Sequence, residues 1–229
     1  MSFFYIVSTP IGNLEDLSFR ALRILKEVDL ILCEDTRVTK KLLDRYKINT
    51  SVLSYHQHSK LKKINYILEL LKQEKHLALV SDAGTPGISD PGNKLIELAI
   101  RELGNKVKIV PIPGSSAITT AVSVSGFPMD KFLFLGFPPA KKKRKKFFEE
   151  VINSKYSVIF YESPYRILRT LNELKNKFQV SSFKFQVVVC RELTKKFETI
   201  YRGEINEVIE EIKKDKIKGE FVVIVEDKK

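Results

Sequence analysis

The sequence predicts an α/β protein with a largely parallel sheet. Short runs rich in β-branched and aromatic residues alternate with longer segments of helical periodicity along the 229 residues. Hydrophobic residues make up 43% of the chain and charged residues 30%, a balance that is typical of a globular domain and argues against intrinsic disorder. No stretch approaches the roughly 20 apolar residues needed to span a bilayer, and the start MSFFYIVSTP lacks the basic segment of a secretory signal. We therefore expect a cytoplasmic protein.

Ten runs are expected to be strands because they are short, apolar and bounded by turn residues. They cover residues 3–7, 30–33, 51–53, 77–80, 107–110, 131–135, 157–161, 186–190, 199–202 and 221–225. The only two cysteines, Cys33 and Cys190, each end one of these runs, so we expect buried, reduced thiols and no disulfide.

Helices are expected between the strands. In 18–27 and 61–71, apolar side chains recur at helical spacing, so each segment has one apolar face that can cover a sheet. Asp90 is a candidate N-cap for a helix whose first residue is Pro91, and Ser115 is a candidate N-cap after Pro113 and Gly114.

Glycine and proline interrupt the pattern between residues 125 and 140. We place a domain boundary near 113–126, which gives an N-terminal α/β domain over 1–115 and a C-terminal α/β domain over 116–229.

Five polar clusters directly follow predicted strands. They cover residues 8–14, 81–92, 111–117, 161–166 and 191–195. Ligands of open α/β folds bind at the carboxyl edge of the sheet, so we expect these clusters to converge on one cleft.

The loop 81–92 is the most specialised of the five. Its twelve residues include three glycines and two prolines, and Asp82 places a carboxylate at the end of the strand. Neither the Walker spacing of glycines before a lysine and a hydroxyl nor a G-x-G-x-x-G pattern is present, so the loop is not a phosphate cradle of those types. It is interpreted as a rigid ligand-binding loop.

The net charge of +12 and pI near 9.5 favour a polyanionic partner such as nucleic acid. Six of the charges form one run from Lys141 to Lys146, which is followed by Phe147 and Phe148. The run is interpreted as an electrostatic RNA contact beside aromatic rings. The alternative is a solvated helix start with both phenylalanines in the core.

Eight motifs together resemble the ribosomal small-subunit methyltransferase I family of the tetrapyrrole methylase superfamily. In order they are TPIGNLED, CEDTR, YHQHS, SDAGTPGISDPG, PGSSA, ESPYR, RELTKKFET and GEFVVIVE, from Thr9 to Glu226. One departure is Tyr165, which stands where the family more often has histidine.

This resemblance implies two α/β domains of the tetrapyrrole methylase type, with S-adenosylmethionine bound in a cleft between them, and a homodimer. It also implies methylation of the ribose 2'-hydroxyl of a cytidine in the decoding region of 16S rRNA within the small ribosomal subunit. The cofactor contacts carried over by motif are Pro10, Ser81, Asp82, Ala83, Gly84, Thr85, Ser115, Ala117, Glu220 and Phe221.

The candidates for a catalytic base are carboxylates that directly follow strands, namely Glu34, Asp35 and Glu162, with Asp82 as a further one. Each of them could instead cap a turn. The expected RNA contacts are Arg37, His56, Lys141, Lys142, Lys143, Arg144, Arg166 and Arg191, because guanidinium groups match phosphate oxygens. We expect no metal site, since His56, His58 and His76 lack partners at ligand spacing.

Two alternatives stay open. One is a methylase of a small tetrapyrrole, which would have no use for six consecutive cations. The other is a non-catalytic RNA-binding module of ribosome assembly, which predicts no cofactor affinity.

Overall fold

The computed structural model describes residues 1–56, 59, 61–180 and 186–226. The chain divides into two compact units, Met1–Ser116 and Ala117–Lys229. The sequence placed this division after residue 115.

The first unit is built on a five-stranded sheet in the order β3-β2-β4-β1-β5, and all of its strand pairs are parallel. Its strands are β1 (Ser2–Val7), β2 (Leu30–Cys33), β3 (Val52–Ser54), β4 (Leu77–Val80) and β5 (Val107–Ile112). Its helices are α1 (Phe19–Glu27), α2 (Thr36–Arg45), α3 (Leu61–Lys72) and α4 (Asn93–Leu103), with short 3-10 turns at Leu14–Asp16 and Gly104–Lys106.

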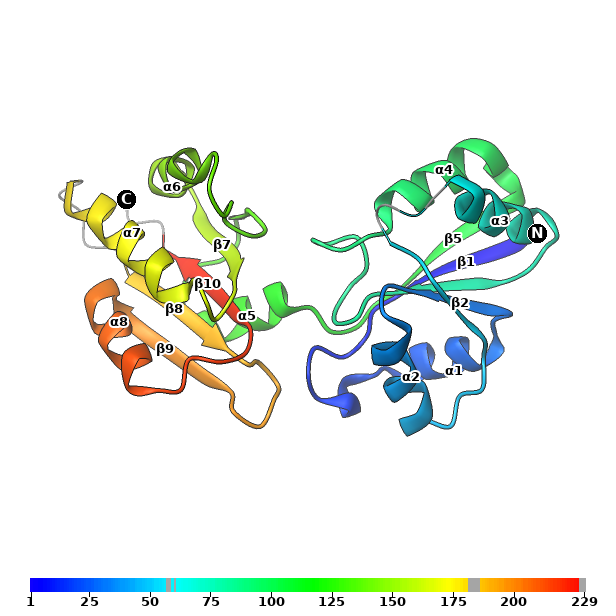
Figure 1. Ribbon diagram of the computed structural model, residues 1–229, viewed down its shortest axis with the longest axis horizontal. Coiled ribbons are helices and arrows are strands. Elements are labelled where there is room, and N and C mark those ends of the chain that lie inside the picture. Colours follow the sequence, from blue (N-terminus) through cyan, green and yellow to red (C-terminus); the bar gives the residue numbers. More distant parts are fainter. Residues whose placement is uncertain (57–58, 60, 181–185, 227–229) are drawn as a thin grey trace. The chain divides into compact units, whose positions relative to one another are not determined.

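Helices cover both faces of this sheet (Figure 1). The apolar sides of α1 and α2 pack in one cluster with Val7, Ile31 and Val80. The apolar sides of α3 and α4 pack in a second cluster with Phe4 and Leu79. Alternate residues of one strand therefore serve opposite cores, as the side-chain alternation of a strand requires.

Helix α1 begins as the sequence predicts, because the Ser18 hydroxyl accepts a hydrogen bond from the Ala21 N–H. The predicted start at Asp90 and Pro91 is wrong. Helix α4 begins at Asn93, after Gly92 adopts a φ of 147° that side chains rarely allow. The Asn93 side-chain amide donates to the Gly87 carbonyl at 3.0 Å and fixes the preceding loop.

The second unit contains a five-stranded sheet in the order β6-β7-β10-β8-β9. Its strands are β6 (Phe132–Phe134), β7 (Ser157–Glu162), β8 (Gln186–Arg191), β9 (Thr199–Glu204) and β10 (Phe221–Val225). Its helices are α5 (Ala117–Ser125), α6 (Arg144–Asn153), α7 (Ile167–Val180) and α8 (Ile205–Lys214).

The prediction of a largely parallel sheet is wrong for this unit. Among the strand pairs that the structure describes in this unit, only β6 and β7 are parallel, whereas β10 is antiparallel to both β7 and β8, and β8 is antiparallel to β9. Residues 192–198 join β8 to β9 without a helix, and a short connection of this kind permits only antiparallel neighbours.

One apolar core holds the second unit together. Side chains from α6, α7 and α8 pack against one face of the sheet, with Phe160 and Val223 fully buried. Cys33 and Cys190 are buried free thiols, as predicted, and burial raises the pKa of Cys190 to about 12. In the ranges that the structure describes, no helix has the length and apolar character needed to cross a membrane.

Candidate functional site

The carboxyl ends of β1, β2, β4 and β5 lie at one edge of the first sheet, because the strands are parallel. The neighbours β1 and β4 lead to α1 and α4, which cover opposite faces. Such a point, where the chain turns away in two directions, is where open α/β sheets bind their ligands.

Hydrogen bonds join the loops that follow β1 and β4. The Thr9 N–H donates to the Gly84 carbonyl at 2.9 Å, and the Gly84 N–H donates to the Thr9 carbonyl at 3.0 Å. The Thr9 hydroxyl also donates to the Ser81 carbonyl at 3.0 Å. Gly84 has a φ of 82°, which explains the need for glycine at this position.

The loop after β5 is held to the same edge. The hydroxyls of Ser8 and Thr85 are 2.9 Å apart, and the Thr85 hydroxyl lies 3.2 Å from the Ser115 carbonyl. A side chain on Gly114 would come within 3.0 Å of the Ser8 Cβ, so the two backbones can approach only because residue 114 is glycine.

The Ser81 hydroxyl directly follows β4 at this edge of the sheet. Ser81 is 4% exposed, and its Oγ forms no hydrogen bond with any residue in the described ranges. Leaving a buried hydroxyl unsatisfied costs about 1–3 kcal/mol. A polar ligand at this edge would satisfy the Ser81 hydroxyl, so the residues present fit a ligand with polar atoms.

Of the ten expected cofactor contacts, seven lie at this edge of the first unit: Pro10, Ser81, Asp82, Ala83, Gly84, Thr85 and Ser115. Ala117 is the first residue of α5, Phe221 is the first residue of β10 and Glu220 directly precedes that strand, so these three belong to the second unit.

Three carboxylates cluster at the ends of β2 and β4. An Asp82 carboxylate oxygen accepts the Asp35 N–H at 3.0 Å, which joins the two loops. Asp35 caps α2 and holds the Arg37 guanidinium at 2.6 Å, and these hydrogen bonds keep the pKa of the Asp35 carboxyl well below its ordinary value. A carboxylate of such low basicity is a poor proton acceptor. Half-buried Glu34 forms no hydrogen bond or ion pair with the residues that the structure describes.

In the second unit, three motifs meet at one edge of the sheet. Phe221 pairs with Glu162 on one side and with Arg191 on the other, so β10 begins where β7 and β8 end. Phe221 is 1% exposed as a whole residue and its ring is buried in the core, so it offers almost no surface to a ligand.

A charged cluster continues this edge. The Lys195 ammonium lies 2.8 Å from carboxylate oxygens of both Glu192 and Glu220, and the Glu220 N–H donates to Glu192 at 3.0 Å. Burial would raise the pKa of Glu192, but the hydrogen bonds from Lys195 and the Glu220 N–H outweigh burial and lower it. The side chain of Glu192 lies directly over Gly219, where a Cβ would be 2.2 Å from its Cδ.

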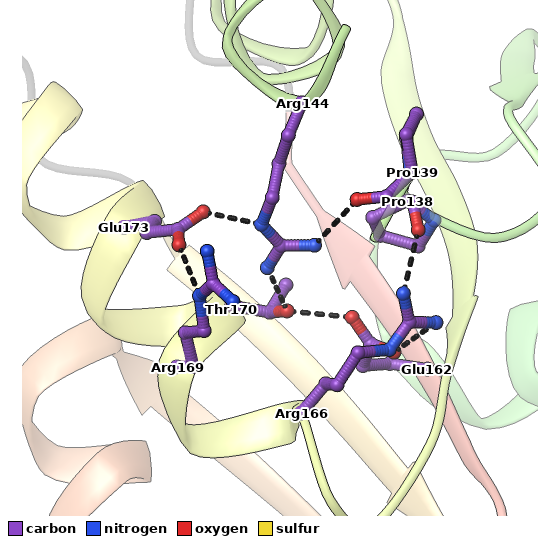
Figure 2. Close-up of polar contacts among 8 residues, drawn as sticks. All are labelled: Pro138, Pro139, Arg144, Glu162, Arg166, Arg169, Thr170 and Glu173. Atoms are coloured by element: carbon purple, nitrogen blue, oxygen red, sulfur yellow. Dashed lines mark hydrogen bonds and ion pairs between the residues drawn. The ribbon is translucent and has the colours of Figure 1, made fainter. Parts of the chain in front are cut away.

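Glu162 lies inside a buried polar network instead of at an open site. Its carboxylate accepts the Thr170 hydroxyl at 2.5 Å and pairs with Arg166 at 2.8 Å, and its side chain is 0% exposed (Figure 2). Thr170 in turn accepts a hydrogen bond from Arg144 at 2.6 Å. A carboxylate that is engaged in this way has no access to a substrate proton.

The structure changes the expected set of RNA contacts. Arg144 is 5% exposed and Arg191 is 8% exposed. Arg144 donates to Glu173 at 2.6 Å and to the Pro139 carbonyl at 3.1 Å, and Arg191 donates to the Lys218 carbonyl at 3.0 Å. Neither guanidinium is free to contact phosphate, so the side chains of both residues serve the fold.

The other expected contacts are more accessible. Lys141, Lys142, Lys143, Arg37 and His56 are exposed, and Arg166 is half-buried against Glu162. His58 lies outside the described residues.

Phe147 and Phe148 are buried in the core of the second unit, so the alternative interpretation of these two rings is correct. Sequence reasoning missed Thr170 as a polar centre, although its place on the helix after ESPYR, four residues beyond Arg166, was a usable signal.

Within the described residues, no group of three or more histidine, cysteine or acidic side chains could hold a metal ion.

Comparisons with known proteins agree with this architecture. The sequence model of the family described as Tetrapyrrole (Corrin/Porphyrin) Methylases matches residues 4–209. The ribosomal RNA small subunit methyltransferase I of Halalkalibacterium halodurans is 46% identical over 97% of this chain and 75% of its own length. The protein of the same name from Thermotoga maritima is 46% identical over 97% of both chains.

Solved structures share the fold at low identity. A cobalt precorrin-4 methyltransferase of cobalamin biosynthesis has a TM-score of 0.70 at 17% identity, with 98% of this chain and 94% of that chain covered. Uroporphyrin-III-C-methyltransferase from Thermus thermophilus has a TM-score of 0.65 at 15% identity, with 98% and 94% covered. With the fold, the loops at the strand ends and relatives of this similarity in agreement, the chain belongs to the ribosomal RNA small subunit methyltransferase I family of the tetrapyrrole methylases.

Proposed function

We propose that this protein transfers a methyl group from S-adenosylmethionine to the ribose 2'-hydroxyl of a cytidine in the decoding region of 16S rRNA. The observation that supports it most is the edge of the first sheet, where three loops are joined around the unsatisfied Ser81 hydroxyl. The names of the relatives point to ribosomal RNA of the small subunit as the substrate. A cytoplasmic homodimer that acts on the small ribosomal subunit is part of this proposal.

The cofactor is proposed to bind at this edge of the first unit. Ser81 would donate or accept one hydrogen bond, and the paired Thr9 and Gly84 main chains hold the loop beside it in place. When bound, S-adenosylmethionine supplies a methyl group on a sulfonium, which needs no metal for its transfer. Because Thr9, Thr85 and Ser115 already fix the loops to one another, little ordering remains for the binding step.

The chain's main contribution to the reaction is positioning. Holding the ribose hydroxyl in line with the methyl group is worth about 7–11 kcal/mol, and a general base adds a factor of about 10²–10⁴. Among the carboxylates predicted as bases, Glu34 remains the best candidate. Glu162 is buried in an ion pair, Asp35 has a lowered pKa, and Asp82 accepts the Asp35 N–H. We propose that Glu34 accepts the proton of the 2'-hydroxyl.

The surface charge favours RNA over a small tetrapyrrole as substrate. Lys141, Lys142, Lys143, Lys145 and Lys146 are all exposed, even though Arg144 is buried. A run of accessible cations suits an extended polyanion such as RNA, whose charges continue along the chain.

Label transfer tests the proposal directly. The protein is incubated with S-adenosylmethionine labelled in the methyl group and with small ribosomal subunits that lack the modification, and the label is then mapped. We expect one labelled ribose on a cytidine of 16S rRNA. Label on a base or on protein would refute the proposal, and efficient labelling of uroporphyrinogen III without labelling of RNA would favour the small-molecule alternative.

Cofactor binding has its own test. Asp82→Ala should weaken S-adenosylmethionine binding, measured by calorimetric titration, because it removes the oxygen that accepts the Asp35 N–H and joins two loops of the site. Normal affinity with lost turnover would instead make Asp82 the candidate base. Absence of any binding by the unaltered protein would support the non-catalytic RNA-binding alternative.

A further inference from the structure

Two aromatic side chains of the second unit, Phe137 and Tyr165, lie on its surface. Phe137 is 52% exposed and Tyr165 is 96% exposed. The ring of Phe137 contacts the ring of Tyr161 with centroids 5.3 Å apart, which limits its freedom. Single exposed aromatics are common on proteins, so their surroundings decide whether they have a role.

The two rings belong to segments that the buried network ties together (Figure 2). The Arg166 guanidinium donates to the Pro138 carbonyl at 2.9 Å, and each partner of this hydrogen bond is the chain neighbour of one exposed aromatic. Arg144 donates to the next carbonyl, that of Pro139, at 3.1 Å. The loop that carries Phe137 and the turn that carries Tyr165 are therefore held at a fixed spacing.

The same network continues to the interior. Arg144 also donates to Thr170, which donates to Glu162, which pairs with Arg166. Glu173 bridges Arg144 and Arg169 at 2.6 and 2.7 Å. Such a closed set of charged hydrogen bonds gives a rigid arrangement, because each group loses its partner if another one moves.

Three exposed cations lie beside these segments. Lys141, Lys142 and Lys143 directly follow the loop of Phe137 and precede Arg144, and none of them forms an ion pair with the residues that the structure describes. The left-handed backbone of Lys143, with a φ of 66°, turns the chain into α6. The buried Arg144 thus anchors the run, and the three lysines before it remain available.

We propose that Phe137, Tyr165 and Lys141–Lys143 form a surface for single-stranded RNA, which we call the aromatic-lysine surface. The rings stack on unpaired bases, the lysines contact phosphates, and the Arg144 network positions both segments without touching RNA. Proteins that bind single strands combine a basic track with stacking rings in this way, and a duplex would hide the base faces. The proposal rests on RNA as the substrate and names the residues that bind it outside the cofactor edge.

A fluorescein-labelled decauridylate is the binding probe, and its affinity is measured by fluorescence anisotropy against salt concentration. Tyr165→Ala and Phe137→Ala should each weaken binding by about 5- to 100-fold, the range for loss of one stacked base. Tyr165→Phe should restore most of the affinity, because the stacking face is kept. Phe19→Ala is the matched control, because this ring is 93% exposed in the first unit, and it should change nothing.

Charge has a separate readout. Replacing Lys141, Lys142 and Lys143 with glutamine should lower the slope of log affinity against log salt by about 2, since each phosphate contact on a single strand contributes about 0.7. The control is the same replacement at the exposed Lys213, Lys214 and Lys216 of the same unit, which should leave the slope unchanged. Equal slopes in both triple variants would overturn the role of the lysine run.

The positioning role of Arg144 is tested by coupling. Arg144→Lys keeps the charge but cannot make all three hydrogen bonds, so it should raise the KM for small subunits and leave the affinity for S-adenosylmethionine unchanged. If Arg144 acts through the surface, the loss of decauridylate binding free energy in the double variant Arg144→Lys with Tyr165→Ala should be smaller than the sum of the losses in the two single variants. Strict additivity would overturn this part of the proposal.

Failure of this inference differs from failure of the proposed function. If the unaltered protein methylates rRNA but the Phe137 and Tyr165 variants bind decauridylate and small subunits normally, the aromatic-lysine surface is refuted and the function stands. If the unaltered protein does not methylate rRNA but loses decauridylate when Tyr165 is changed, the surface stands and the function is refuted.

Discussion

The substitution Glu162→Gln should destabilise the second unit without removing a catalytic group. Glu162 is a candidate base by sequence, yet its carboxylate accepts hydrogen bonds from Thr170 and the Ser163 N–H at 2.5 and 2.8 Å and pairs with Arg166 at 2.8 Å. Glutamine keeps the shape and removes the charge, so the Arg166 guanidinium and one donor lose their partner.

Glu162→Gln should lower the free energy of unfolding of the second unit by about 2–3 kcal/mol. Removing one partner of a buried ion pair typically costs about 3–5 kcal/mol. The Arg166 side chain is 25% exposed and keeps part of its hydration, and the amide oxygen of glutamine can still accept one hydrogen bond, so the value is reduced. For a unit of about 100 residues, this loss lowers Tm by roughly 8–15 °C.

Circular dichroism during heating measures this change, and methyl transfer is measured at a temperature where the variant is folded. Glu149→Gln is the matched control, because Glu149 is 46% exposed and its ion pairs with Lys145 and Lys177 are 3.9 and 4.0 Å long. Such surface pairs contribute about 0–1 kcal/mol. A Glu162→Gln variant with an unchanged Tm and a kcat reduced more than about 100-fold would refute the structural role and identify Glu162 as the base.

Three further predictions concern other residues. Ser81→Ala should leave the free energy of unfolding unchanged or raise it by up to about 1 kcal/mol, because it removes an unsatisfied hydroxyl, whereas calorimetry should show weaker S-adenosylmethionine binding. Gly219→Ala should lower the free energy of unfolding by about 1–3 kcal/mol in a denaturant titration, since φ is 89° and the new Cβ would clash with the Glu192 side chain. A change near zero would mean that the turn can move. Lys195→Met should lower the free energy of unfolding by about 1–2 kcal/mol at neutral pH, measured by urea unfolding at a series of pH values. The folded state lowers the pKa of Glu192 below 4.5 and raises that of Lys195 above 10.5, where hydrogen bonds to Glu192 and Glu220 outweigh burial. The difference in free energy of unfolding between the unaltered protein and Lys195→Met should therefore be constant from about pH 6 to 9 and shrink below about pH 4.5. A difference that grows on acidification would contradict this assignment.

The ten strands in the described part of the chain could all be located from the sequence, because each is a short apolar run between turn residues. The direction of the strands in the second unit could not. Alternation of strands and helices implies parallel neighbours, and residues 192–198 break that alternation with a connection that looks like an ordinary ligand loop. The path that places β10 between β7 and β8 depends on contacts between distant segments, which local patterns do not carry.

The candidate site shows the same division. The glycine and hydroxyl residues of the first unit could be singled out because loops that follow parallel strands must meet at one edge. Arg144 could not be separated from its neighbours, because six consecutive cations look alike by composition. Its place at the start of α6, beside Phe148 with the guanidinium carbon 5.0 Å from the ring centroid, turns it inward towards Thr170 and Glu173.

The contrast between Ser81 and Glu162 separates residues that serve a ligand from residues that serve the fold. Both are nearly inaccessible polar residues at the end of a strand. The carboxylate of Glu162 is satisfied by its own unit, so the fold accounts for its burial. The Ser81 hydroxyl is buried at a cost that no contact in the described residues offsets, while the loops around it are fixed by hydrogen bonds of their own. The fixed loops keep other protein groups of the described residues away from this hydroxyl, which supports the proposal that a polar ligand completes this edge.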